Sequence, residues 1–239
     1  MITHAVPGFL PSASGFAFPN RFPRVPVRRI GIPGIPGIVS VPIGDASNGL
    51  CGGMAFAVRD YFEAGKPPPG LGDAPGEGTL FDYLVDRLFD SFDLPLGPAR
   101  YLKLMSPHLP DGETFLSRFG IGPHGRAWLM VREEWPKVRA DIDAGHPSPL
   151  GLVRVKSNDP FDLKENHQVL AYGYDQEDGA LTLRLYDPNL PKRDDVTMSF
   201  SLADPNAPTP VRSFPGGPRI FAFFRVPYAR SSPPAEPPM

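Results

Sequence analysis

Cys51, His167 and Asp187 are the residues whose types and order could support nucleophilic catalysis. Cys51 is the only cysteine of the chain and begins a helical pattern, whereas His167 opens a strand-like run and Asp187 closes the next one. The helix dipole and unpaired backbone N–H groups favour the thiolate form of a cysteine in the first turn of a helix. A distant imidazole and carboxylate in this order are typical of a thiol-nucleophile hydrolase. The alternative is that Cys51 is a small buried apolar residue.

The imidazole and the carboxylate are expected to meet at one end of a β-hairpin. His167 begins an alternating run that fixes the direction of its ring, and antiparallel pairing of the two runs would bring Asp187 beside it. We expect Asp187 to accept a hydrogen bond from Nδ1–H of the imidazole, which fixes the tautomer and stabilises the imidazolium. The segment around Asp187 is equally an ordinary turn sequence, and Asn189 is a second candidate for orienting the ring. His146, just after a helical pattern, is the one competing histidine.

Helical patterns fill the first part of the chain and strand patterns the second. Hydrophobic periodicity predicts helices over residues 51–64, 79–92, 98–105 and 127–144, with Pro136 either starting a new helix or kinking one. Alternation and turn residues predict strands over residues 150–155, 169–174, 181–186, 196–202 and 220–226. Helices followed by strands predict the α+β class with an antiparallel sheet.

The first predicted helix carries the candidate nucleophile. Its apolar residues fall on one face of the helix, and Asp60 lies outside that face. We therefore expect only one face of the helix to be buried. Gly52 and Gly53 follow Cys51 and carry no side chain. We therefore expect the backbone amides beside the thiol to be open to a substrate carbonyl.

Proline and glycine, 33 and 25 of 239 residues, divide the chain into three parts. Residues 1–43 are rich in both and predict an extended N-terminal arm, because such stretches resist helix and central-strand structure. Their position before Cys51 also fits a pro-segment that occludes the site. Residues 44–228 form the predicted α+β domain, and residues 229–239 a disordered tail.

Composition limits the classes of partner. The formal charge of −2 gives no reason to expect nucleic acid or an anionic membrane surface as a partner. We find no run of about 18 apolar residues and no N-terminal leader, so we expect no membrane partner and a cytoplasmic location. A single cysteine excludes an internal disulfide, and no cluster has the spacing of a zinc site. We therefore expect neither a metal nor a cofactor.

Three short motifs together resemble the papain-like cysteine hydrolase superfamily. They are Cys51-Gly52 at a helix start, His167-Gln-Val-Leu-Ala-Tyr-Gly-Tyr on a strand and Leu185-Tyr-Asp187-Pro at the end of the next strand. The closest pattern is that of bacterial peptidases similar to the double-glycine-leader (bacteriocin-processing) enzymes, over about residues 45–190. The resemblance implies a papain-like fold with Cys51 as nucleophile, His167 as general base and then acid, and Asp187 as orienter.

One position departs from the family pattern. The family usually places a glutamine six residues before the cysteine to help form the oxyanion hole, and that position is Asp45. A carboxylate there would repel a developing oxyanion. Asn48 is the nearest amide donor and could take the role of the glutamine, or it could cap the helix and serve structure alone.

The resemblance implies a peptidase or amidase that acts on a peptide, protein or other amide or ester through a thioester on Cys51. An amine in place of water would make the protein an acyltransferase, and the sequence does not choose between them. A third interpretation is a catalytically silent papain-like scaffold that binds a protein partner through its proline-rich arms, which Asp45 favours slightly. A fourth is a structural protein of unrelated topology with Cys51 in its core.

Overall fold

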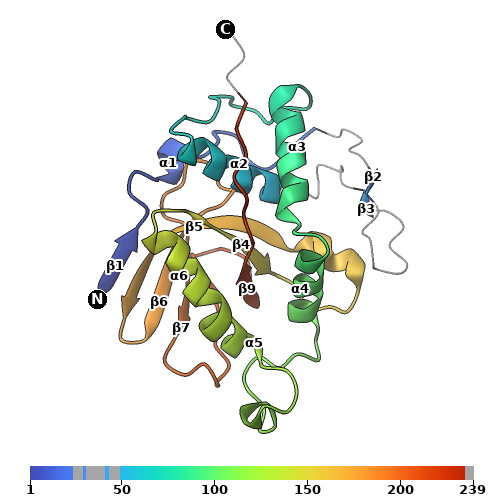
Figure 1. Cartoon of the computed structure of the whole chain (residues 1–239), viewed down its shortest axis with the longest axis vertical. Helices are drawn as coiled ribbons and strands as arrows, with labels where there is room; N and C mark the ends of the chain where they lie inside the picture. Colours follow the sequence, from blue (N-terminus) through green and yellow to red (C-terminus); the bar gives the residue numbers. More distant parts are fainter. Residues whose placement is uncertain (24–28, 31–40, 43–48, 235–239) are drawn as a thin grey trace.

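An antiparallel β-sheet with helices packed around it forms the body of the chain, and the computed structural model describes residues 1–23, 29–30, 41–42 and 49–234 (Figure 1). The strands of this sheet are β1 (Ile2–Ala5), β4 (Ser148–Val153), β5 (His167–Glu177), β6 (Ala180–Tyr186), β7 (Thr197–Ser201), β8 (Arg212–Ser213) and β9 (Ala222–Arg225). Their order is β8-β7-β6-β5-β4-β9, and β1 pairs with the second half of β5. The pairings are antiparallel, so the fold is α+β, as predicted. Two short strands, β2 (Arg29–Ile30) and β3 (Val41–Pro42), pair separately.

The helices lie on both sides of this sheet and at its end. They are α1 (Pro11–Ser14), α2 (Cys51–Glu63), α3 (Thr79–Ser91), α4 (Leu96–Met105), α5 (Arg126–Trp128) and α6 (Trp135–Asp143). A π-helical segment, Leu129–Glu134, joins α5 to α6, and 3₁₀ turns cover Ser117–Phe119 and Pro160–Glu165. Pro136 is the second residue of α6, and the π-helical segment leads directly into this helix with helical backbone at Glu134 and Trp135, so the proline lies within one continuous helical run and does not start a separate helix.

The predicted helices and strands are all present, with ends shifted by a few residues. The short helix α1 and the strands β1, β2, β3 and β8 were not predicted. β8 has only two residues, and β1 has four residues that a proline-rich stretch follows directly. Runs this short show no periodicity that could distinguish them from loops.

Residues 1–23 are built into the sheet and the core. β1 pairs with β5 from Ile2 opposite Gln176 to Ala5 opposite Gly173. The phenylalanines that follow are buried, namely Phe9, Phe16, Phe18 and Phe22. Extended, proline-rich backbone is therefore present, as expected for an arm, but its aromatic side chains anchor it within the domain.

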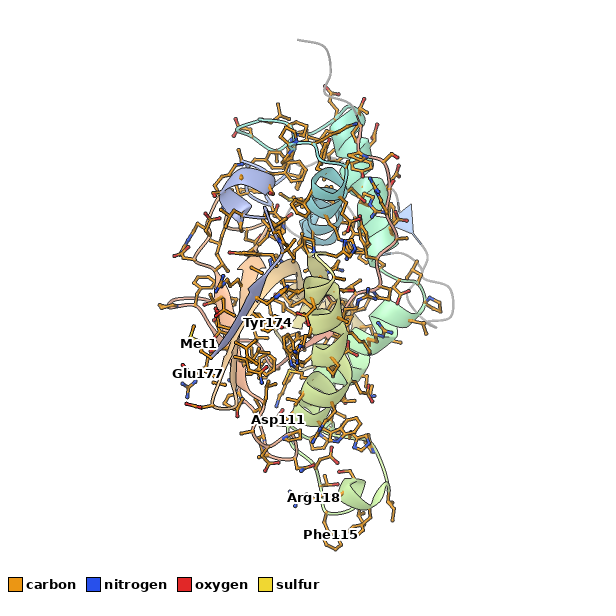
Figure 2. All side chains as sticks on the ribbon, turned by 60° about the vertical axis from the view of Figure 1, so that its left-hand side comes forward. Met1, Asp111, Phe115, Arg118, Tyr174 and Glu177 are labelled. Carbon is orange, nitrogen blue, oxygen red and sulfur yellow. The ribbon has the colours of Figure 1, made fainter. Side chains whose placement is uncertain are left out.

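A lobe around Phe115 and Arg118 projects from one end of the molecule (Figure 2). At its base, the buried guanidinium of Arg126 donates hydrogen bonds to the backbone oxygens of Leu104 and Ser106. The tip exposes large apolar side chains, namely Phe115, Leu116, Phe119 and Ile121. The lobe is thus anchored at its base and apolar at its tip.

Helix α2 is buried on nearly all sides, so the prediction of a single buried face was wrong. Every residue from Gly52 to Tyr61 is buried, including Asp60. A Cβ atom at Gly53 would collide with the backbone oxygen of Leu84 in α3. The glycine therefore allows the two helices to approach closely, as they do in Figure 1.

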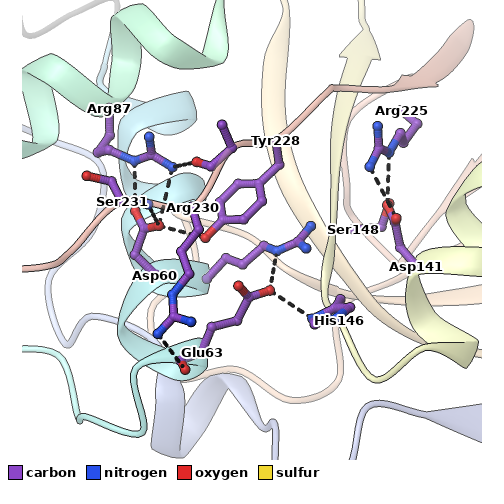
Figure 3. A network of polar contacts seen from close by, with 12 residues as sticks. Asp60, Glu63, Arg87, Asp141, His146, Ser148, Arg225, Tyr228, Arg230 and Ser231 are labelled. Carbon is purple, nitrogen blue, oxygen red and sulfur yellow. Dashed lines mark hydrogen bonds and ion pairs between the residues drawn. The ribbon is translucent and has the colours of Figure 1, made fainter.

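A buried ion pair between Asp60 and Arg87 joins α2 to α3 and to the end of the chain (Figure 3). Arg87 Nε lies 2.7 Å from Asp60 Oδ2. Tyr83 and Tyr228 donate hydroxyl hydrogen bonds of 2.7 and 2.6 Å to the same carboxylate, and the N–H of Ser231 adds one of 2.9 Å. A buried carboxylate persists only with such partners, which explains how Asp60 can lie in the core.

The prediction of a disordered tail was wrong for residues 229–234. Arg87 Nη2 donates to the backbone oxygen of Ala229 at 2.8 Å, and Arg230 donates to the backbone oxygen of Glu63 at 3.2 Å. The tail is ordered because the carboxylate of Asp60 and the guanidinium of Arg87, both remote from it in sequence, bind its backbone. Residues 235–239 lie outside the described part of the chain.

Replacing Asp60 with asparagine should destabilise the protein by about 3 kcal/mol, because Arg87 then loses its buried counter-ion and keeps only the exposed carboxylate of Asp90. Urea unfolding followed by circular dichroism measures the change. Asp90→Asn is the matched control, since Asp90 also pairs with Arg87 but its side chain is 56% exposed. We expect this control to lose less than about 1 kcal/mol. Equal losses for the two variants would contradict the role given to Asp60.

Candidate active site

Three separate elements bring the predicted catalytic residues together. Cys51 is the first residue of α2, His167 is the first residue of β5, and Asp187 directly follows β6. Because β5 and β6 are antiparallel neighbours, the start of one and the end of the other lie at the same end of the sheet. Helix α2 packs on β5, which places its N-terminus at this end as well.

His167 and Asp187 form a buried hydrogen-bonded pair. Nε2 of His167 lies 2.7 Å from Oδ1 of Asp187, and the two residues are 4% and 7% exposed. The prediction that Asp187 bonds to Nδ1 was therefore wrong, because the ring presents its other nitrogen to the carboxylate. This orientation leaves Nδ1 on the opposite side of the ring from Asp187.

Asn189 contacts both members of this pair. Its backbone N–H donates to Oδ1 of Asp187 at 2.8 Å, and its side-chain Nδ2 lies 3.3 Å from Nε2 of His167. Asn189 was predicted as an alternative to Asp187 for orienting the ring. In the structure both residues lie beside His167, with the carboxylate closer to the ring nitrogen.

The thiol of Cys51 interacts with the ring of His167. Burial on its own would raise the pKa of Cys51, but the charge of His167, a hydrogen bond with its side chain and the N–H groups of Gln168 and Gly52 outweigh that effect. The pKa of Cys51 therefore lies below its ordinary value of 9.0. These influences favour a thiolate at the helix N-terminus.

The charges of its two neighbours keep His167 protonated. Burial would lower its pKa, but the charges of Asp187 and Cys51 and hydrogen bonds with both raise the pKa of His167 to about 10. Burial would likewise raise the pKa of Asp187, but the charge of His167 and its hydrogen bond lower it. The shifts of all three pKa values favour the same charged arrangement, a thiolate, an imidazolium and a carboxylate in a row.

The competing histidine and the expected amide donor do not lie in this group. Nδ1 of His146 lies 2.9 Å from Oε1 of Glu63, at the other end of α2 (Figure 3). Asn48 and Asp45 lie outside the described residues, so the two roles considered for Asn48 stay predictions.

The glycines beside Cys51 serve packing, a role that was not predicted from the sequence. A Cβ atom at Gly52 would collide with Oγ of Ser91 and lie 2.9 Å from Oε1 of Gln168. Gly53 lies against the backbone of α3 in the same way. Neighbouring protein atoms leave no room for a side chain at either position.

Two polar residues near the thiol were missed from the sequence. Tyr101 in α4 donates its hydroxyl to the backbone oxygen of His167 at 3.3 Å. Burial is the main cause that raises the pKa of Tyr101, and the charge of Cys51 adds to it. Gln168 donates from Nε2 to the backbone oxygen of Ser91 at 3.3 Å, while its buried Oε1 has no hydrogen-bond partner in the described part of the chain. The position of Gln168 next to His167 could have identified it from the sequence, whereas no sequence pattern indicated Tyr101.

Comparison of the chain with protein-family models, with curated proteins and with solved structures finds no match. Within the described ranges, no helix has both the length and the apolar character to cross a bilayer, and no group of His, Cys, Asp and Glu side chains could hold a metal ion. Function must therefore be inferred from the geometry and electrostatics of the Cys51–His167–Asp187 group.

Cys51 should react with iodoacetamide at mildly acidic pH, where an ordinary thiol is protonated. Its lowered pKa depends on His167, so His167→Asn should raise the pKa of Cys51 and move the reaction to higher pH. If the acidity of the thiol falls tenfold, the rate of alkylation at pH 6 should fall by about tenfold as well. Mass spectrometry measures the rate, and no second thiol interferes because Cys51 is the only cysteine.

The matched control is His146→Asn, which removes a histidine that pairs with Glu63 and should leave the pH dependence unchanged. An unchanged profile in His167→Asn would show that the imidazole does not activate Cys51.

Proposed function

We propose that the protein is a papain-like cysteine hydrolase that cleaves amide or ester bonds through a thioester on Cys51. The observation that carries this proposal is the row of Cys51, His167 and Asp187, in which the imidazole contacts the thiol on one side and the carboxylate on the other. The nucleophile at the start of a helix that packs on an antiparallel sheet agrees with the arrangement that the resemblance implies.

Exposure within the group suits this chemistry. Cys51 is partly exposed, whereas His167 and Asp187 are buried. A substrate would approach from the side of Cys51, while the ion pair behind it is shielded from water and from salt. Shielding preserves the attraction that keeps the thiolate ready for attack.

In the first half of the reaction, the Cys51 thiolate attacks the substrate carbonyl carbon, a C–S bond forms, and the carbonyl electrons move to oxygen. The backbone N–H of Cys51, at the free N-terminus of α2, is placed to hold this oxyanion. The imidazolium of His167 then gives its proton to the leaving amine or alcohol as the bond to carbon breaks. The products of this half are a thioester on Cys51 and neutral His167.

In the second half, water attacks the thioester while neutral His167 accepts its proton. Collapse of the intermediate breaks the C–S bond, releases the acid and restores the thiolate–imidazolium pair. Asp187 holds the ring through Nε2 throughout, so that the opposite nitrogen stays directed at the reacting atoms.

Turnover should depend on Cys51 and Asp187 to different extents. With fluorogenic peptide amides and p-nitrophenyl acetate as probes, Cys51→Ala should lower kcat/KM by at least about 1000-fold. Asp187→Ala should lower it by about 100-fold, because the thiol remains but the ring loses its orientation and its counter-charge. Activity should also fall as the pH rises past about 10, where His167 loses the proton it gives to the leaving group.

The same assay separates the competing interpretations. Acyl-Cys51 that is released only when an amine is added would identify an acyltransferase. A Cys51 that is alkylated at low pH but never acylated by any probe would favour a catalytically silent scaffold. Wild-type protein with the thiol reactivity of a free cysteine would overturn the proposal itself.

A further inference from the structure

The segment of residues 11–20, here called the N-terminal strap, is bound along the loop of residues 187–194, here called the Asp187 loop. Ser12 donates from its backbone N and its Oγ to the carboxylate of Asp194, at 2.8 and 2.6 Å. Lys192 Nζ donates to the backbone oxygen of Gly15 at 2.8 Å, and the N–H of Asn20 donates to the backbone oxygen of Pro188 at 2.8 Å. The strap therefore contacts the Asp187 loop at both ends and in the middle.

Aromatic packing fixes the same strap to helix α2. Phe16 and Phe18 are fully buried and their rings stack at 4.9 Å, and the ring of Phe16 also meets that of Tyr61 edge-on at 6.1 Å. Tyr61 belongs to the helix that Cys51 begins. One short segment thus touches both the element that carries the nucleophile and the loop that carries the orienting carboxylate.

Asn20 makes the connection closest to the reacting groups. Its Oδ1 accepts a 2.6 Å hydrogen bond from the N–H of Leu50, the residue before Cys51. Its Nδ2 donates to Oδ1 of Asn189 at 3.2 Å. Gly49 adopts a φ of 62°, and a Cβ atom there would collide with the Asn20 side chain, so a glycine is needed for this approach.

We propose that Asn20 is a positioning residue that sets the distance between Cys51 and the His167–Asp187 pair, an inference that rests on the proposed function. The chain of contacts runs from Leu50 through Asn20 to Asn189, which itself contacts Asp187 and His167. In this proposal the strap supports the active site and does not occlude it.

A primary amide suits this position because it offers an acceptor and a donor in one rigid plane. Aspartate could still accept from Leu50 but has no hydrogen to give to Asn189, and alanine would make neither bond. Errors of about 1 Å in the placement of reacting groups lower rates by about 100-fold, so a loosened bridge should be measurable.

The test compares Asn20→Ala and Asn20→Asp with the wild type by the pH dependence of Cys51 alkylation. A looser site separates the thiolate from the imidazolium, so the pKa of Cys51 should rise and the rate at pH 6 should fall by about tenfold or more. A residue that only supports the fold would lower thermal stability without moving this pH profile. Asn158→Ala is the matched control, because Asn158 makes a comparable bond of 3.1 Å with Ser106 Oγ on the surface.

Each outcome decides the inference. A shifted profile in Asn20→Ala with an unchanged control would support it, whereas a shift in Asn20→Asp alone would not, because a new carboxylate raises the pKa of a nearby thiol by its charge. A wild-type profile in folded Asn20→Asp would overturn it, even if Asn20→Ala fails to fold, because the bond to Asn189 would then be unnecessary. If the wild type itself reacts as an ordinary thiol, the proposed function fails, and that result is distinct from failure of the role of Asn20.

Discussion

The charge on the buried imidazole of His167 is the interaction on which the rest of the site depends. A cation in a poorly hydrated position is costly unless anions meet it, and here Cys51 and Asp187 meet it from opposite sides. Each member stabilises the ionised form of the next. Loss of the carboxylate would weaken the imidazolium, and a neutral imidazole could no longer hold the thiolate. The ionisation states of the three residues therefore depend on one another.

The fold meets this requirement with elements that are themselves held by buried polar contacts. Antiparallel pairing of β5 with β6 brings His167 and Asp187 to one end of the sheet. Helix α2 is fixed against α3 by the close approach at Gly53 and by the Asp60–Arg87 ion pair. The same ion pair binds the backbone of the chain end. A helix buried on nearly all sides has little freedom to rotate, so its first residue is held in one direction.

Much of this arrangement could be predicted from the sequence, since it follows from periodicity and residue type. The helices and central strands have strong apolar patterns, and Cys51, His167 and Asp187 stood out by their types and order. The nitrogen that faces Asp187 could not be predicted, because ring rotation depends on where tertiary packing puts the carboxylate. The burial of Asp60 was hidden for a similar reason: its partners Arg87 and Tyr228 come from other elements. Asn20 lies in a proline-rich stretch with no pattern at all, and only the folded chain shows what it joins.

The two asparagines that lie closest to the charged group, Asn189 and Asn20, make their contacts through neutral groups. Asn189 supports Asp187 through a backbone N–H, and Asn20 reaches Leu50 and Asn189 through an amide. Neutral dipoles can fix distances without adding net charge, whereas a lysine or a glutamate at the same places would shift the pKa of the thiol or of the ring. A site whose reactivity depends on a balance of charges is therefore best held by groups that carry none. Under the proposed function, this requirement accounts for two asparagines, rather than a salt bridge, between Cys51 and the residues proposed to activate it.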